Sequence, residues 1–133
     1  MAQFRFMELD IWKESISLND FLYDLADNLI EIKNFRMAEQ LRAASLSISN
    51  NIAEGSGSDS SKDFARFLVF SKRSAFEVAN ISIVMSRRNF ITKEQLDQIL
   101  KDLEYLSRRI TNFRKSLLKD NQNGKKGNKD GQE

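Results

Sequence analysis

Apolar residues recur along most of this chain at the three- and four-residue spacing of one helix face. Four such segments run from about Asp10 to Glu31, Arg36 to Glu54, Lys62 to Arg88 and Lys93 to Leu118. Only short polar stretches separate them. Long amphipathic helices joined by short links predict an all-α, up-and-down four-helix bundle.

Particular residues indicate where the helices begin and end. Ser60 or Ser61 is expected to cap the third helix, because a serine hydroxyl can accept a hydrogen bond from the first turn. Thr92 and Gln95 match a capping box at the start of the fourth helix. Gly55 is predicted to stop the second helix by adopting a positive φ.

The first helix is expected to have an apolar face and an acidic face. The predicted core face is Trp12, Ile16, Leu22, Tyr23, Ala26, Leu29 and Ile30. The acidic stripe is Asp20, Asp24, Asp27 and Glu31. Carboxylate metal sites in bundles also use histidine, which this chain lacks, so no metal site is predicted. A solvated face, or a surface that meets a basic neighbour, is the favoured interpretation.

Composition restricts the function more than the fold. The 133 residues suffice for one domain and include no cysteine, histidine or proline. The chain therefore lacks the commonest general base and any thiolate ligand or disulfide. No catalytic site and no cofactor are predicted. No apolar run approaches the roughly 18 residues of a membrane span, and no signal peptide is recognised, so a cytoplasmic location is the default expectation.

Charge and polarity change along the chain. Residues 1–35 hold 3 basic and 7 acidic side chains, whereas residues 36–133 hold 18 basic and 12 acidic ones. From Asn121 onward there is no large apolar residue, so this part cannot bury enough surface to offset the cost of ordering. The sequence therefore predicts a bundle domain over residues 1–119 and a disordered polar tail over residues 120–133.

Basic residues gather on the outer faces of the third and fourth helices. Such cations can neutralise phosphates, and an oligomer would multiply them into a continuous positive surface. The alternative is a solvated face that is partly neutralised by i,i+4 pairs such as Glu104 with Arg108. The candidate nucleic-acid contacts are Arg66, Arg73, Arg87, Arg108, Arg109 and Lys115.

The third helix also carries apolar residues on the side opposite its core face. Val69, Phe76 and Ile83 recur every seven residues. An exposed phenylalanine between two aliphatic side chains is unusual on the surface of a monomer, and a second copy of the chain is the simplest partner. These residues therefore predict a homo-oligomer interface. The alternative is scattered exposure without a role.

The end of the second helix carries a distinctive string, Asn51-Ile52-Ala53-Glu54-Gly55. Together with Gln40-Leu41-Arg42-Ala43-Ala44, Asp63-Phe64-Ala65-Arg66-Phe67-Leu68 and an early Phe6, Leu9, Trp12 pattern, it resembles the small four-helix-bundle proteins of the 23S rRNA intervening-sequence family. The resemblance covers most of residues 6–118. The chain departs from the family pattern at Ser49, where proline is usual, and at Ser58, where a basic residue is usual.

The resemblance implies homopentamers, genes often located inside inserts of 23S rRNA genes, relatives that contact nucleic acid, and no enzymatic activity. Asn51, Glu54 and Gly55 form the family-like motif. Its polar side chains are interpreted as a network that fixes helix ends or neighbouring subunits, with a ligand or RNA contact as the alternative.

The sequence leads to one main function hypothesis and one alternative. The main hypothesis is a non-catalytic homo-oligomeric scaffold, a homopentamer by resemblance, that associates with structured RNA or another nucleic acid. The alternative is a protein–protein interaction and assembly module with no nucleic-acid role. No membrane partner is expected.

Overall fold

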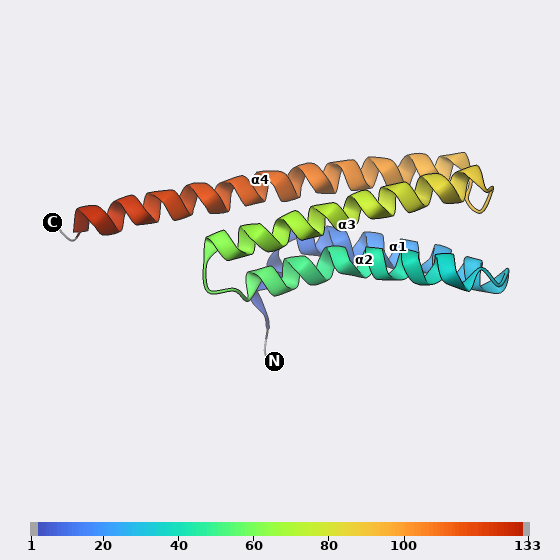
Figure 1. Cartoon of the computed structure of the whole chain (residues 1–133), viewed down its shortest axis with the longest axis horizontal. Helices are drawn as coiled ribbons and strands as arrows, with labels where there is room; N and C mark the ends of the chain where they lie inside the picture. Colours follow the sequence, from blue (N-terminus) through green and yellow to red (C-terminus); the bar gives the residue numbers. More distant parts are fainter. Residues whose placement is uncertain (1–2, 132–133) are drawn as a thin grey trace.

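The computed structural model describes the backbone of residues 3–131 and the side chains of residues 3–121. A short 3₁₀ helix, η1 (Arg5–Glu8), precedes four α-helices: α1 (Asp10–Glu31), α2 (Phe35–Ser56), α3 (Ser61–Arg87) and α4 (Lys93–Gly131). The helices alternate in direction, so the α1–α2 and α3–α4 turns share one end of the molecule (Figure 1). The predicted all-α, up-and-down four-helix bundle is confirmed.

The four helices do not pack equally closely. Each of α1, α2 and α3 packs extensively on the helix that follows it, whereas α4 makes far fewer contacts with α1. Within the described residues, the backbones of the diagonal pairs α1–α3 and α2–α4 lie farther apart than those of neighbouring helices. The helices therefore lie at the four corners of the bundle, and the α1–α4 side is its most open seam.

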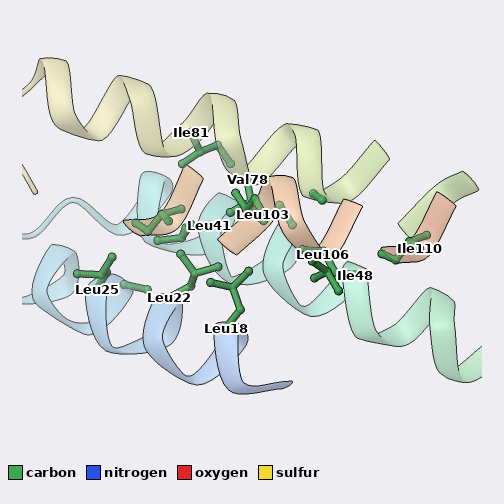
Figure 2. Close-up of a cluster of buried hydrophobic side chains, with 14 of the residues drawn as sticks. Leu18, Leu22, Leu25, Leu41, Ile48, Val78, Ile81, Leu103, Leu106 and Ile110 are labelled. Atoms are coloured by element: carbon green, nitrogen blue, oxygen red, sulfur yellow. The ribbon is translucent and has the colours of Figure 1, made fainter. Parts of the chain in front are cut away.

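One hydrophobic core lies between the helices. Leu22, Leu41, Val78 and Ile99 come from α1, α2, α3 and α4 in turn, and each is 0% exposed. Figure 2 shows side chains from all four helices meeting in this core. Burial of each large apolar side chain stabilises the fold by about 1.5–3 kcal/mol. No described helix has an apolar stretch long enough to cross a bilayer.

The buried face of α1 is rotated from the predicted one, so that prediction is partly wrong. The predicted Trp12, Ile16, Tyr23 and Ile30 lie half-buried at the edge of the core. Trp12 instead packs on Phe6 of η1, with ring centres 5.2 Å apart. The predicted core face included the aromatic residues Trp12 and Tyr23, and it was therefore centred too close to this edge. The residues that α1 buries are Ile11, Ser15, Leu18, Leu22, Leu25, Ala26 and Leu29.

The predicted caps of α3 and α4 are confirmed. Ser60 Oγ accepts a hydrogen bond of 3.0 Å from the backbone N–H of Asp63. Thr92 N–H donates to Gln95 Oε1 at 2.9 Å, and Gln95 N–H donates back to Thr92 Oγ1 at 3.0 Å. These bonds satisfy N–H groups that a helix leaves without partners in its first turn.

Gly55 does not stop α2 by a positive φ, so that prediction is wrong. No described glycine has a positive φ, and Gly55 is buried inside the last turn of α2, which ends at Ser56. A Cβ atom on Gly55 would lie 2.8 Å from Phe64 Cδ1 and 2.8 Å from Phe67 Cβ. Glycine is needed here because the side chains of α3 pack directly on the backbone of α2.

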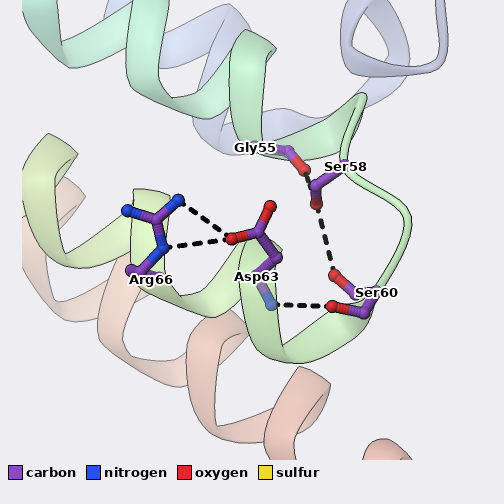
Figure 3. Close-up of polar contacts among 5 residues, drawn as sticks. All are labelled: Gly55, Ser58, Ser60, Asp63 and Arg66. Atoms are coloured by element: carbon purple, nitrogen blue, oxygen red, sulfur yellow. Dashed lines mark hydrogen bonds and ion pairs between the residues drawn. The ribbon is translucent and has the colours of Figure 1, made fainter.

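The loop after Gly55 is held by serine hydroxyls. Ser58 Oγ donates to the backbone carbonyl of Gly55 at 2.5 Å and also lies 3.2 Å from the carbonyl of Ser60 (Figure 3). Ser58 occupies the position where the resembled family usually has a basic residue. In this chain that position closes the α2–α3 loop.

Helix α4 continues to Gly131, past its predicted end near Leu118 and beyond the adjacent end of α3 (Figure 1). Among the residues whose side chains the structure describes, Leu117 is the last of α4 that contributes to the core. No proline stops the helix beyond this point. The side chains of residues 122–133 lie outside the described residues. The disordered tail over residues 120–133 and the domain boundary at residue 119 therefore stay predictions.

Replacement of Gly55 by alanine should test the close approach of α2 and α3. We expect Gly55→Ala to lower the free energy of unfolding, because overpacking costs about 1–3 kcal/mol and opposes the roughly 1 kcal/mol that alanine gains within a helix. Gly57→Ala is the matched control, since the nearest atom to its Cβ would be Glu54 O at an acceptable 3.5 Å. Chemical denaturation measures both variants, and equal stability of the two would contradict the packing argument.

Candidate nucleic-acid interface

A groove of about 530 Å³ lies along the seam between α3 and α4. Its α3 wall includes Lys72 and Phe76, and its α4 wall includes Arg108, Asn112 and Lys115. The only carboxylate in its lining is Glu104. The groove thus combines three cations with an exposed amide, which are groups that bind phosphate and sugar in nucleic-acid complexes.

The cations of this groove differ in how firmly they are held. Lys72 Nζ donates to Thr111 Oγ1 at 2.9 Å, which positions the ammonium group between the helices. Arg108 lies 3.8 Å from Glu104, and the two side chains are 69% and 72% exposed. A pair that exposed is weak, because water screens it. Arg108 and the exposed Lys115 can therefore reorient toward an anionic ligand.

A second hollow of about 600 Å³ lies toward the start of α3, on the same seam. Lys62, Arg66 and Arg114 supply its cations. Two guanidinium nitrogens of Arg66 each lie 3.0 Å from Asp63 Oδ1 (Figure 3), and the group stacks 4.8 Å from the Phe67 ring centre. Arg114 Nε is buried without a hydrogen-bond partner among the described residues. The two hollows together make the α3–α4 seam basic over much of its length.

The structure places the six predicted contact residues in different parts of the molecule. Arg66, Arg108 and Lys115 line the two hollows of the seam. Arg73 adjoins the groove through a small hollow that it shares with Lys72 and Phe76. Arg87 is exposed near the end of α3. The sixth residue, Arg109, lies elsewhere.

Arg109 joins α4 to α1. Its guanidinium pairs with Glu14, lies 3.4 Å from Asp10, and stacks 5.5 Å from the ring centre of Tyr105. Only 33% of its side chain is exposed. These contacts favour a structural role over a phosphate contact. Sequence reasoning missed them because Glu14 lies 95 residues away along the chain.

Several groove residues were also missed by sequence reasoning. Lys72, Thr111 and Asn112 line the groove beside the predicted cations. Lys72 and Ala79 lie seven residues apart, at the edge of the α3 core stripe that faces α4. This seven-residue spacing is the feature of the sequence that could have indicated the groove. It does not identify the groove by itself, because the sequence does not show which helix packs against that edge of α3.

The predicted apolar residues of α3 lie on the surface. Phe76 is 62% exposed and Ile83 is 41% exposed, whereas Val69 is half-buried. We call these three residues the α3 ridge. Arg73 and Arg87 flank the ridge at helical spacing. The α3 ridge is therefore an exposed apolar strip bordered by cations.

Asn51 takes part in a small polar network between α2 and α3. Its side-chain amide donates to Ser47 O at 2.8 Å and to Ser47 Oγ at 3.1 Å, and Ser74 Oγ lies 2.8 Å from the same hydroxyl. Glu54 is exposed and does not share these bonds. Asn51 and Gly55 thus both lie where α2 meets α3, one through hydrogen bonds and the other through close packing.

The acidic stripe of α1 faces solvent. Asp20, Asp24, Asp27 and Glu31 are all exposed. Asp27 pairs with Arg42 of α2 at 2.5 Å. Within the described part of the chain, no cluster of three or more histidine, cysteine or carboxylate side chains could hold a metal ion.

Comparison with known proteins gives a family and a fold. A model described as 23S rRNA-intervening sequence protein matches residues 7–112. The chain is also similar to a crystal structure of a protein of unknown function from the S23 ribosomal protein family of Bacteroides thetaiotaomicron. The TM-score is 0.74 and the identity 24%, with 79% of this chain and 98% of that chain covered. At that identity the likeness supports the fold alone. No curated protein matches the chain.

The effects of replacing Arg109 and its neighbour Arg108 on stability should differ, because only Arg109 has a structural role. We expect Arg109→Ala to lower the free energy of unfolding by about 1–3 kcal/mol, because it leaves the Glu14 carboxylate without its cation. Oε2 of Glu14 is already buried without a partner among the described residues. Arg108→Ala should change the free energy by no more than about 0.5 kcal/mol, as for an exposed site. Urea denaturation measures both, and equal losses would contradict this assignment.

Proposed function

The chain belongs to the 23S rRNA-intervening sequence protein family, and from that premise we propose that it is a non-catalytic scaffold that binds structured RNA. The observation that carries the proposal is the basic α3–α4 seam. Six cations line its two hollows, against only two carboxylates: Lys62, Arg66, Lys72, Arg108, Arg114 and Lys115, with Asp63 and Glu104.

Local charge matters more here than net charge. The chain as a whole carries only +2, but phosphates bind the cations that lie within a Debye length, about 8 Å at physiological salt. Asp63 and Glu104 offset the charges of Arg66 and Arg108, so four of the six positive charges along the seam remain unbalanced. The seam therefore presents a positive strip to an approaching phosphate backbone.

The groups between the cations suit RNA in particular. Structured RNA is recognised largely through its shape, its phosphates and its 2′-hydroxyl groups. Asn112 is exposed within the groove and can both donate and accept a hydrogen bond. A cytoplasmic location, where structured RNA is abundant, is part of the same proposal.

We further propose that the protein acts as a homo-oligomer, a pentamer as the resemblance implies, with the α3 ridge in the interface. The exposed Phe76 and Ile83 support this part. The ridge also supports the second candidate function, a protein–protein assembly module without a nucleic-acid role. The two candidates differ in one measurable property, because only RNA binding through phosphates releases counterions and depends steeply on salt.

RNA binding should be measured by titration of the protein into a labelled, structured 23S rRNA fragment at several salt concentrations. We expect Arg108→Gln combined with Lys115→Gln to weaken binding. The slope of log affinity against log salt should fall by roughly 2, one for each lost phosphate contact. Both residues line the α3–α4 groove.

The matched control is Arg36→Gln combined with Lys93→Gln, which removes two exposed cations that line neither hollow of the seam. It should bind RNA as the unchanged protein does. An equal loss of slope in the control would mean that binding is diffuse. No binding at the lowest salt concentration would reject the RNA proposal and leave the assembly module.

Oligomer formation should depend on Phe76. We expect Phe76→Glu to dissociate the assembly, since it places a charge in an apolar contact that must be desolvated. Leu46→Glu is the control, because Leu46 is 40% exposed on α2 and lies outside the α3 ridge. Light scattering gives the mass of each variant. Unchanged mass for Phe76→Glu would exclude the α3 ridge as the interface.

A further inference from the structure

The floor of the α3–α4 groove is apolar, and contacts with phosphate alone would leave it unused. Ala75 and Leu103 form this floor and are 1% and 3% exposed, and the half-buried Ala79 adjoins them. The small side chains of Ala75 and Ala79 leave α3 without bulk on the side that faces α4. A groove of about 530 Å³ therefore remains, within the range of about 300–1,000 Å³ that is typical of small-ligand sites.

Uncharged hydrogen-bonding groups line the α4 wall of this groove. Ser107 and Thr111 follow Leu103 at intervals of four residues and therefore share its face of α4, and Asn112 lies beside them. Ser107 is only 8% exposed, and no hydrogen bond joins its hydroxyl to another residue that the structure describes. Thr111 Oγ1 accepts a hydrogen bond from Lys72 and keeps its own proton to donate. The wall therefore offers both donors and acceptors to a ligand.

The cations lie at the rim of the groove, not on its floor. Arg108 and Lys115 are exposed on α4, and Lys72 reaches across from α3 to within 2.9 Å of Thr111 Oγ1. A ligand that fills the groove would therefore place an apolar part with hydrogen-bonding groups on the floor and an anionic part at the rim. A nucleotide has this division, because its base has flat apolar faces and hydrogen-bonding edges and is joined to a phosphate.

The depth of the hydrogen-bonding groups favours an unpaired nucleotide over a duplex. An RNA duplex keeps its bases stacked inside and presents its phosphates and 2′-hydroxyl groups on the outside. That surface can reach the exposed Arg108 and Lys115, but it cannot reach a side chain as buried as Ser107. A nucleotide in a loop or bulge can leave the stack, and its base then exposes the edges that pairing would otherwise occupy.

Two other hollows of the described structure lack this combination. In the hollow toward the start of α3, the one uncharged hydrogen-bonding side chain is Ser60, whose hydroxyl already accepts a hydrogen bond from the N–H of Asp63. A groove of about 530 Å³ between α1 and α4 has Glu14 and Asp102 in its lining, and carboxylates repel phosphate. Of the three, the α3–α4 groove is therefore the one that suits both parts of a nucleotide.

We propose that the α3–α4 groove holds a single unpaired nucleotide of the bound RNA. The base lies on the apolar floor with one edge toward the α4 wall, and its phosphate lies at Arg108 and Lys115. These contacts do not require Phe76, which belongs to the α3 ridge. The inference rests on the RNA-binding part of the proposed function, and it names the feature of the RNA that the groove recognises, which is a bulge or loop and not a continuous duplex.

Three kinds of labelled hairpin RNA test this site in titrations with the full chain at one salt concentration. The first hairpin is fully paired, the second carries one bulged nucleotide, with each of the four bases in turn, and the third carries an abasic residue at the bulge. The second and third differ only in the base. We expect at least one bulged hairpin to bind about tenfold more tightly than the abasic one, as two hydrogen bonds to the base would give. Equal affinity for all the hairpins would overturn the inference.

Two variants that change no charge should remove this preference and keep the salt dependence. Ala79→Leu fills the groove, and Ser107→Ala with Asn112→Ala removes two hydrogen-bonding groups from its wall. Ala53→Leu is the matched control, because Ala53 is also half-buried and lines none of the three hollows, so it should keep the tenfold preference. Circular dichroism checks folding, and the double alanine variant decides if Ala79→Leu does not fold. A preference that survives in the folded variants would overturn the inference.

The same titrations separate this inference from the rest of the proposed function. Equal, salt-dependent binding of all the hairpins would overturn the nucleotide site and leave RNA binding intact. No binding of any hairpin or of the 23S rRNA fragment at the lowest salt concentration would overturn both. Free nucleoside monophosphates should bind more weakly than the bulged hairpin, because they lack the neighbouring phosphates that reach the other cations of the seam. Tighter binding of a free nucleotide would overturn RNA as the source of the ligand.

Discussion

The arrangement of the whole bundle depends on how closely α3 lies against α2. At Gly55 the backbone of α2 meets Phe64 and Phe67 with no room for a Cβ. Farther along the same contact, Ser71 Oγ donates to Ile48 O at 2.7 Å. Small residues such as Gly55 and Ser71 allow the two helices to approach, and the serine hydroxyl satisfies a polar group that the close contact buries. This contact fixes the rotation of α3, and that rotation places Phe76 on the surface and Lys72 toward α4.

The opposite side of the bundle is built differently. Few residues of α1 and α4 touch, and Arg109 bridges the gap to Glu14 and Asp10. The ion pair joins α1 and α4, and the side chains between these helices do not fill the space completely. A groove therefore remains where a more tightly packed bundle would have a hydrophobic core. The molecule thus has one closely packed seam and one open seam, and its surface features follow from that difference.

Helix starts and caps could be predicted from the sequence because spacing and local hydrogen bonds determine them, whereas α4 continues to Gly131, past its predicted end near Leu118. The predicted bounds of α1 matched, as did the caps at Ser60 and Thr92. The role of Gly55 was predicted wrongly, because glycine is favoured both where the backbone has a positive φ and where two helices pack closely. The groove around Lys72 could not be predicted, since it depends on which helix edges face each other. The contacts of Arg109 with α1 were missed for the same reason.

The length of α4 has a consequence for any ring of these chains. Rotation about a single axis leaves every copy pointing the same way along that axis. In a ring whose axis runs along the helices, the end of α4 that extends beyond α3 (Figure 1) would emerge on one face only. The other face would carry the short α1–α2 and α3–α4 turns. Such a particle has a front and a back, so it can meet a large ligand in a single orientation without any asymmetry between its subunits.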